Sequence, residues 1–343
     1  MSLLAQECPQ DGEPLWASED YDDQNEFDAL TAGLNNRIGT LPNPTIEHAA
    51  IKKKRQLGAG GFAIVYEADA PRPSCSSSRS QQNGPCACKV FSFIAGMGER
   101  QTNFFKNWLH ELKVLDYLSK RPECGVVDFY GFSLQHDQAD AKIVVQICME
   151  LMKGGSLRDN LLRLPLPLAF TIMRQVAMAL RGLHAPEHDV FGTNKFVSIV
   201  HRDLKPENVL LSEKLTSGKP STIVCKLCDV GLAALRTDPS LQTVGHATTK
   251  VGKAGTYPYI APETLLQGKC TPASDVFSLG LLMWELIVGD IPFHDVPNLD
   301  GMLPIFWQDG RRPPLDVEPF ESVPRKLRQL IEKCWNADRY NWL

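Results

Sequence analysis

Four short strings hold the side chains of this chain that could do chemistry on a phosphate. Leu57–Val65 (LGAGGFAIV) is rich in glycine, which lets backbone N–H groups approach phosphate oxygens closely. Cys86–Lys89 ends on a lysine, Ile199–Asn208 (IVHRDLKPEN) combines an acid, bases and a carboxamide, and Asp229–Gly231 begins with another acid. A glycine-rich turn is common between strands, so its interpretation depends on the strings that follow it.

The string Ile199–Asn208 matches the catalytic loop H-R-D-L-x-x-x-N of protein kinases at every defined position. Asp229–Gly231 (DVG) occupies the D-F-G position of that family, and Ala261–Glu263 matches A-P-E. From about Ile51 to its end, the chain therefore resembles the eukaryotic protein kinase superfamily. The order of the three strings argues against a nucleotide-binding metabolic enzyme.

This resemblance implies a catalytic set. Asp203 is expected to orient the substrate hydroxyl, Lys205 to stabilise the transferring phosphoryl group, and Asn208 and Asp229 to bind Mg²⁺. Because the transition state of phosphoryl transfer is loose, such a set acts mainly by positioning and by neutralising charge.

The resemblance also assigns an ATP site. Lys89 is expected at the α- and β-phosphates, held by the acid Glu111, while the backbones of Glu150 and Met152 bond adenine and Met149 is the gatekeeper. The expected ATP-lining residues are Leu57, Gly58, Ala59, Gly60, Gly61, Phe62, Ala63, Val65, Ala87, Lys89, Met149, Glu150, Met152 and Leu210. Ala63 stands where the family has a third glycine, which should stiffen the loop modestly.

The activation segment is expected to run from Asp229 to Glu263, and phosphorylation within it could pair with Arg202. Lys205 and Thr256 are typical of serine/threonine kinases. Other strings resemble the tyrosine-kinase-like (TKL) group, so we predict a serine/threonine kinase of that group. The candidate activation-segment residues are Thr243, Thr248, Thr249 and Thr256.

Two alternatives stay open. A dual-specificity or tyrosine kinase would keep the same chemistry on another acceptor, and a pseudokinase-like scaffold would bind ATP without transferring phosphate. Pseudokinases typically lose one of the residues equivalent to Lys89, Asp203 or Asp229, and all three are present. The family arginine that pairs with Glu263 is expected at Trp342, so we predict a truncated or abnormal C-terminal end.

We expect an α+β fold of two lobes. Residues 1–50 form an acidic leader that we predict to be disordered, and 51–343 form the kinase domain. Its first lobe, about 51–153, should be a small antiparallel β-rich unit with one main helix at Gln101–Ser119, and its second, about 154–343, should be mostly helical. Residues 71–85, rich in Ser, Pro and Gln, are predicted as a loop insertion. Further helices are predicted at Leu168–His184, Ala273–Val288 and Pro324–Trp335.

Composition bounds the setting. The chain has 343 residues, is 43% hydrophobic and carries a net charge of −4. Residues 1–50 hold ten acids and one base, which leaves +5 for the rest. Ten scattered cysteines and the lack of a signal-peptide pattern predict reduced thiols and a cytoplasmic location, with access to the nucleus left open. The expected partners are protein substrates and regulatory proteins, with no nucleic acid and no membrane insertion; the cofactors implied by the resemblance are ATP and Mg²⁺.

Overall fold

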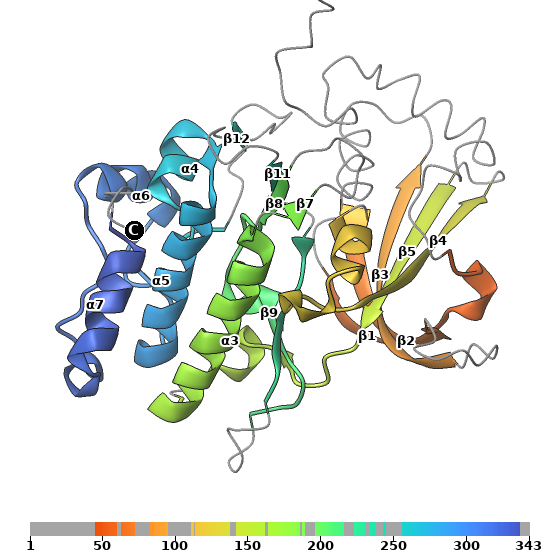
Figure 1. Ribbon diagram of the computed structural model, residues 1–343, viewed down its shortest axis with the longest axis horizontal. Coiled ribbons are helices and arrows are strands. Elements are labelled where there is room, and N and C mark those ends of the chain that lie inside the picture. The colour runs from red at the N-terminus through yellow and green to blue at the C-terminus, as the bar shows by residue number, and fades with distance from the viewer. Residues whose placement is uncertain are drawn as a thin grey trace, which may run out of the picture.

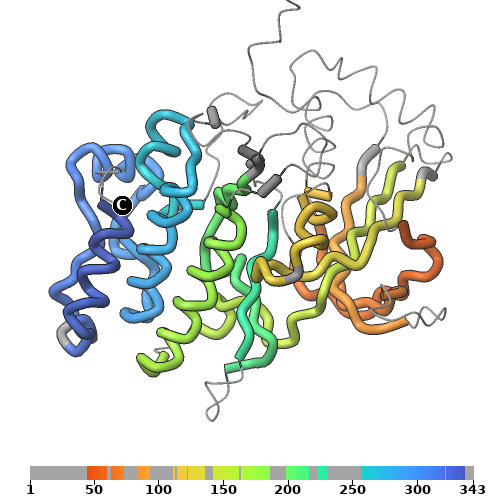
Figure 2. The backbone as a smooth tube through the Cα atoms, in the orientation of Figure 1, coloured from red at the N-terminus to blue at the C-terminus, as the bar shows by residue number. Residues whose placement is uncertain are grey.

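The computed structural model shows a β sheet on one side, helices on the other, and short strands between them (Figure 1). The last helix lies at the far end of the molecule from the sheet (Figure 2). The structure describes residues 45–59, 63–72, 83–94, 111, 112, 114–137, 142–161, 164–185, 187, 188, 196–215, 223–230, 234–236, 243, 244 and 256–336.

The first lobe is an antiparallel sheet of five strands in the order β1-β2-β3-β5-β4. Residues 111, 112 and 114–119 are helical, in the second half of the predicted helix. The α+β class and the two-lobed fold predicted from the sequence are thus confirmed. The strands are β1 (Lys52–Ala59), β2 (Ala63–Pro71), β3 (Asn83–Ile94), β4 (Phe129–Asp137) and β5 (Lys142–Glu150).

The alternation of side chains along β3 separates a core from a site. Cys86 and Cys88 are fully buried in a small cluster that includes Ala68. Because neighbouring residues of a strand point to opposite faces, Ala87 and Lys89 lie on the other face of β3. The sheet therefore directs Lys89 away from this cluster and toward the second lobe.

The loop insertion of the first lobe differs from the expectation. The predicted loop at 71–85 is shorter, because β2 extends to Pro71 and β3 begins at Asn83, and these two residues pair directly. Arg72 donates from Nη2 to the carbonyl of Pro85 at 2.6 Å, which supports this extension. Before β1, Thr45 forms a bridge with Phe132.

The helices of the second lobe follow the predicted apolar periods. Helix α3 (Leu166–His184) buries a stripe that includes Ile172, Val176 and Leu183. Helix α5 (Pro272–Val288) begins with a capping box formed by Thr271 and ends at Gly289 with a φ of 81°. The others are α4 (Pro262–Gln267), α6 (Leu299–Gln308) and α7 (Arg325–Cys334).

Short strands connect the two halves and carry the catalytic strings. They form small sheets in the orders β10-β9-β6, β11-β8-β7 and β12-β13. Their bounds are β6 (Gly155–Ser156), β7 (Glu187–His188), β8 (Phe196–Val200), β9 (Val209–Leu211), β10 (Cys225–Leu227), β11 (Ala234–Arg236), β12 (Thr243–Val244) and β13 (Lys269–Cys270).

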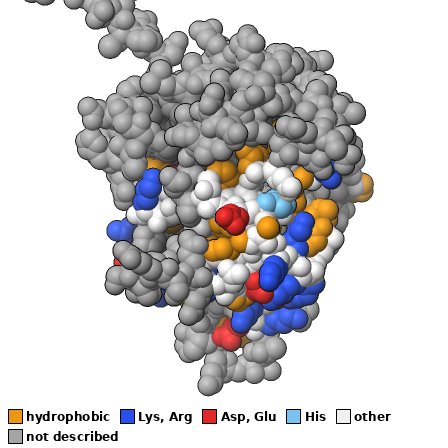
Figure 3. All heavy atoms as spheres, turned by 90° about the vertical axis from the view of Figure 1, so that its right-hand side faces the viewer, with side chains coloured by type: hydrophobic (Ala, Val, Ile, Leu, Met, Phe, Trp, Pro, Cys, Tyr) orange, Lys and Arg blue, Asp and Glu red, His pale blue; other side chains and the backbone are white. Residues whose placement is uncertain are grey.

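The surface of β1 is exposed along all eight of its residues. Two of its four bases are paired with acids of β2: Lys54 lies 2.8 Å from Asp69 and Arg55 lies 2.7 Å from Glu67. The sheet side of the molecule shows Lys and Arg side chains gathered with acidic side chains among them (Figure 3). Among the residues described, no helix has the length and apolar character needed to cross a membrane.

Candidate active site

Lys89 and Glu111, which the family resemblance pairs, meet in the structure. The ammonium of Lys89 lies 2.7 and 2.8 Å from the two carboxylate oxygens of Glu111, and 3.1 Å from Oδ1 of Asp229. Strand β3, the helical residues 111, 112 and 114–119, and the turn after β10 each supply one group. The contact with Asp229 links the two lobes directly.

The three charges shift one another's pKa values. Burial opposes the charge on Lys89, yet Glu111 and Asp229 outweigh it and raise the lysine pKa. Burial raises the pKa of Glu111, which is only 3% exposed, and Lys89 offsets part of that rise. Burial also disfavours the charge of Asp229, but the attraction of Lys89 dominates and its pKa is lowered. Lys89 and Asp229 therefore carry opposite charges at neutral pH.

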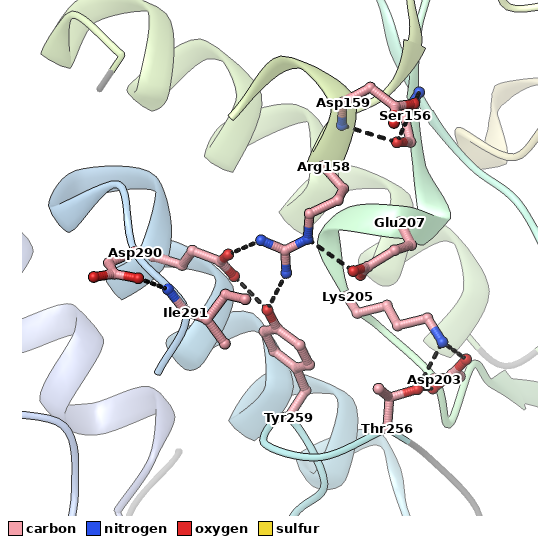
Figure 4. Close-up of polar contacts among 11 residues, drawn as sticks. Ser156, Arg158, Asp159, Asp203, Lys205, Glu207, Thr256, Tyr259, Asp290 and Ile291 are labelled. Carbon is pink, nitrogen blue, oxygen red and sulfur yellow. Dashed lines mark hydrogen bonds and ion pairs between the residues drawn. The ribbon is translucent and has the colours of Figure 1, made fainter. Parts of the chain in front are cut away.

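A triangle of polar groups surrounds Asp203. Lys205 Nζ lies 2.8 Å from Oδ2 of Asp203, and Thr256 Oγ1 donates to Oδ1 at 2.8 Å. Lys205 also donates to Thr256 Oγ1 at 2.6 Å. The amide of Asn208 donates to the backbone oxygen of Asp203 at 2.8 Å and to its Oδ2 at 3.1 Å. The catalytic loop and the segment at 256–261 thus converge on one carboxylate (Figure 4).

The backbone of the catalytic loop is hydrogen-bonded to Asp275 of α5. Its carboxylate accepts the backbone N–H of His201 at 2.7 Å and of Arg202 at 2.8 Å, and lies 2.8 Å from Nε2 of His184. Arg202 adopts a left-handed φ of 71°, which costs energy for a residue with a side chain. Although burial opposes its charge, the hydrogen bond of His184 lowers the pKa of Asp275. An ionised, buried acceptor therefore stabilises the strained turn.

His201 connects this loop with the strand before Asp229. Its Nδ1 accepts the N–H of Asp203 at 3.3 Å, and its Nε2 lies 3.1 Å from the carbonyl of Cys228. The two contacts together require Nε2 to carry the proton. The Cys228 carbonyl is thereby fixed next to Asp229, which has a left-handed φ of 59°.

Several of the predicted ATP-lining residues, Val65, Ala87 and Met149 among them, lie on the face of the sheet that carries Lys89. Val65 pairs with Lys89, Ala87 pairs with Met149, and Gly58 pairs with Val65. Leu210 lies in β9 beside β6, which follows the hinge, the segment of residues 150–154 that joins the two lobes. Leu57, Ala59, Ala63, Glu150 and Met152 are also described, whereas Gly60, Gly61 and Phe62 lie outside the described residues, as do Thr248, Thr249 and Trp342.

The hinge has an ion-pair contact that motif reasoning missed. Lys226, three residues before Asp229, lies 2.6 Å from Oε2 of Glu150 and 3.0 Å from Oδ1 of Asp128. His184 was missed as well, and so was Arg158, which bonds to Glu207, Tyr259 and Glu285. These contacts join residues 49 to 127 positions apart, so spacing alone carries no signal for them.

Glu263 was expected to pair with an arginine near the C-terminus. In the structure its Oε1 accepts the hydroxyl of Ser274 at 2.8 Å, and the carboxylate is 8% exposed. The position expected for the arginine, Trp342, is not among the described residues. Ser274 also closes the capping box of α5, so Glu263 is tied to the start of the helix that carries Asp275.

The fold and the order of these motifs are those of a protein kinase domain, and comparison with known proteins agrees. The family model of the protein kinase domain matches residues 51–342. This chain belongs to the protein kinase family.

Curated relatives match parts of the chain. It is 31% identical over 196 residues, 56% of its length, to mitogen-activated protein kinase kinase kinase 10 of Mus musculus and of Homo sapiens. It is also 31% identical over 296 residues, 86% of its length, to ephrin type-B receptor 1 of Gallus gallus. The matches cover 18% of the first two proteins and 26% of the receptor, so the chain spans about a fifth to a quarter of these relatives.

Proposed function

We propose that this protein is an ATP- and Mg²⁺-dependent serine/threonine kinase of the TKL group that acts in intracellular signalling. In this account Asp203 orients the acceptor hydroxyl and takes up its proton, and Lys205 neutralises charge on the phosphoryl group as it moves. Lys89, held by Glu111, binds the α- and β-phosphates. When bound, ATP supplies the γ-phosphoryl group and Mg²⁺ neutralises its charge.

The contact of Lys205 with Thr256 is the observation that carries the choice of acceptor. The Thr256 hydroxyl bridges Lys205 and Asp203 at 2.6 and 2.8 Å, and its segment lies beside the carboxylate that would receive a short serine or threonine side chain. Sequence identity does not select the acceptor, because this chain is 31% identical both to mitogen-activated protein kinase kinase kinase 10 and to ephrin type-B receptor 1. Transfer to tyrosine is the second candidate.

The residues present fit a nucleotide. Val65, Ala87 and Leu210 are apolar and partly exposed, which leaves surface for an adenine ring, whereas the neighbouring Cys86 and Cys88 are fully buried. A methyl group built on Gly58 would meet no described atom within 4 Å, so its backbone stays accessible. Met149 is 9% exposed and lies opposite Ala87, where a gatekeeper would limit the depth of the site.

The donor set also fits Mg²⁺, which prefers oxygen ligands and keeps phosphate oxygens or waters among them. Asp229 uses Oδ1 for Lys89 and is 48% exposed, so its other oxygen is available to a metal. The NH₂ group of Asn208 is used by Asp203, which orients the amide oxygen of Asn208 away from that carboxylate. We therefore assign these two residues as the metal ligands.

Regulation and location are part of the proposal. Among the described residues, the buried Nε of Arg202 has no hydrogen-bond partner, which suits a phosphate on Thr243, Thr248 or Thr249 of the activation segment. Eight cysteines of the described part are free, as is typical of the reducing cytoplasm. Proposed partners are protein substrates and regulators.

Phosphoamino-acid analysis tests the acceptor. We expect label from γ-labelled ATP to appear in phosphoserine or phosphothreonine of a generic protein substrate, and to vanish when EDTA removes Mg²⁺. Phosphotyrosine as the main product would instead support the second candidate. ATP binding without transfer would favour a pseudokinase scaffold and contradict the proposal.

A further inference from the structure

A second polar cluster adjoins the catalytic loop and is centred on Arg158 (Figure 4). Arg158 lies in the 3₁₀ helix η4 (Arg158–Asn160), just past the hinge. Its Nε donates to Oε1 of Glu207 at 2.7 Å, its Nη2 donates to the hydroxyl of Tyr259 at 2.6 Å, and its Nη1 bonds Oε1 of Glu285. One planar guanidinium therefore joins four segments of the chain.

The cluster is buried at Glu285 and exposed at Glu207. The Tyr259 hydroxyl donates to the second oxygen of Glu285, whose carboxylate is fully buried. Glu207, in contrast, is 42% exposed. Arg158 is thus the bridge between a buried acid of α5 and an exposed acid of the catalytic loop.

The backbone around Arg158 is held by hydrogen bonds that do not involve the Arg158 side chain. The carboxylate of Asp159 accepts the hydroxyl of Ser156 at 2.6 Å and its N–H at 3.1 Å, and the amide of Asn160 donates to the carbonyl of Gly154 at 2.9 Å. The N–H of Leu157 donates to Val209 at 2.7 Å, on the strand that follows the catalytic loop. The backbone that carries the guanidinium of Arg158 is therefore well ordered by these hydrogen bonds.

Both acceptors of Arg158 outside α5 lead to the same carboxylate. Glu207 stands between Lys205 and Asn208, which both contact Asp203. The N–H of Tyr259 donates to the carbonyl of Thr256 at 2.8 Å, and Thr256 in turn contacts Lys205 and Asp203. We call the contacts of Arg158 with Glu207 and with Tyr259 its two arms. A shift of either arm would change the triangle of Lys205, Thr256 and Asp203.

We propose that Arg158 is a positioning residue for phosphoryl transfer, which sets the catalytic loop and the segment 256–261 at the separation that lets Lys205 and Thr256 reach Asp203 together. This rests on the proposed kinase function. The hydroxyl of Ser278 donates to the carbonyl of Tyr259 at 2.8 Å, so the segment stays attached to α5 without Arg158. Loss of the guanidinium should therefore misplace the site more than it unfolds the lobe.

The first test separates positioning from simple stabilisation. Arg158→Met should lower kcat by about tenfold to a hundredfold, with the KM for ATP changed less than about twofold, because misplacement by about 1 Å affects the transition state and not nucleotide binding. Arg158→Lys should restore the melting temperature but not kcat, since an ammonium neutralises Glu285 but cannot bridge three acceptors. Lys120→Met, which breaks an exposed ion pair with Asp116 at 3.1 Å, is the control and should leave kcat unchanged.

The two arms should also be coupled through Arg158. Glu207→Ala and Tyr259→Phe each remove one acceptor, and the double variant should be no slower than the slower single variant. Strictly additive losses would contradict a shared bridge. Recovery of kcat along with stability in Arg158→Lys would likewise reduce Arg158 to a structural residue.

Hydrogen exchange gives a readout that needs no transfer. In Arg158→Met, amide exchange should rise at residues 203–208 and 256–260 while residues 279–287 of α5 keep their protection. If the wild-type chain transfers no phosphate, the proposed function fails, but the exchange pattern still decides the positioning claim. A uniform rise, or none at the two segments, would overturn it.

Discussion

The two acids that flank the catalytic loop are held in opposite ways. Asp229, on the nucleotide side, is 48% exposed and takes one side-chain contact from Lys89, whereas Asp275 is 1% exposed and accepts three donors. The carboxylate of Asp229 is accessible, whereas the carboxylate of Asp275 is buried and hydrogen-bonded within the fold. Residues of the same type thus differ in setting: Asp229 is exposed at the proposed metal site, whereas Asp275 stabilises the backbone of the catalytic loop.

Removing each acid in turn should separate these two tasks. Asp275→Ala strips three donors of their acceptor and should lower the free energy of unfolding by about 4 kcal/mol. Asp229→Ala leaves Lys89 paired with Glu111 and should change it by less than about 1 kcal/mol, while abolishing transfer. Denaturant unfolding followed by circular dichroism measures both. Equal losses of stability would break the comparison.

Lys89→Met should abolish transfer and leave a folded protein. Glu111 then remains buried without its partner, and its pKa, already raised by burial, rises further. When an acid has a higher pKa in the folded than in the unfolded state, the free energy of unfolding of the protein falls as the pH rises from the unfolded pKa to the folded pKa. The variant should therefore lose stability relative to wild type as the pH rises above about 4, the unfolded pKa of a glutamic acid, and melting at a series of pH values measures this loss. A difference between variant and wild type that does not depend on pH would contradict this account.

The lowered pKa of Asp275 predicts where acid acts on the fold. Its ionised form contributes stability that is fully present above its unfolded pKa of about 4 and is lost as the pH falls through the lower folded value. In Asp275→Asn the decline of stability between about pH 4 and pH 2 should be shallower than in wild type. Parallel declines in the two proteins would show that other carboxylates dominate.

Thr256 offers the smallest and most local change. Thr256→Val removes the hydroxyl between Lys205 and Asp203 and should lower kcat by about tenfold, because both partners lose a contact at the reacting group. Thr256→Ser keeps the hydroxyl and should retain most activity. If both variants lose activity equally, the methyl group rather than the hydroxyl matters.

Motifs predicted much of this arrangement, and local patterns predicted most long elements. The catalytic loop, the strand of Lys89 and the helices α3, α5 and α7 could be read from residue types and periods. Helix α4 was missed because it has only six residues, and α6 because Pro304 interrupts its pattern. Two-residue strands such as β6 and β13 have no period to detect.

Contacts of side chains that no family motif includes could not be predicted. His184 reaches Asp275 across 91 positions, and Arg158 reaches Glu285 across 127. Both depend on how α3 and η4 pack against α5, which no single segment encodes. The pairing of Lys89 with Glu111 was foreseen because the family resemblance requires an acidic partner for this lysine, not because of any local signal.

Phosphate transfer by Asp203→Asn beside the wild type tests the central claim most directly. The asparagine keeps the shape of the side chain but cannot take up the hydroxyl proton, so kcat should fall by at least about a hundredfold. The Kd for ATP, measured by calorimetry with Mg²⁺ present, should stay within about twofold, because Asp203 positions the acceptor rather than the nucleotide. Transfer retained near the wild-type rate would contradict the role of Asp203 and with it the proposed mechanism.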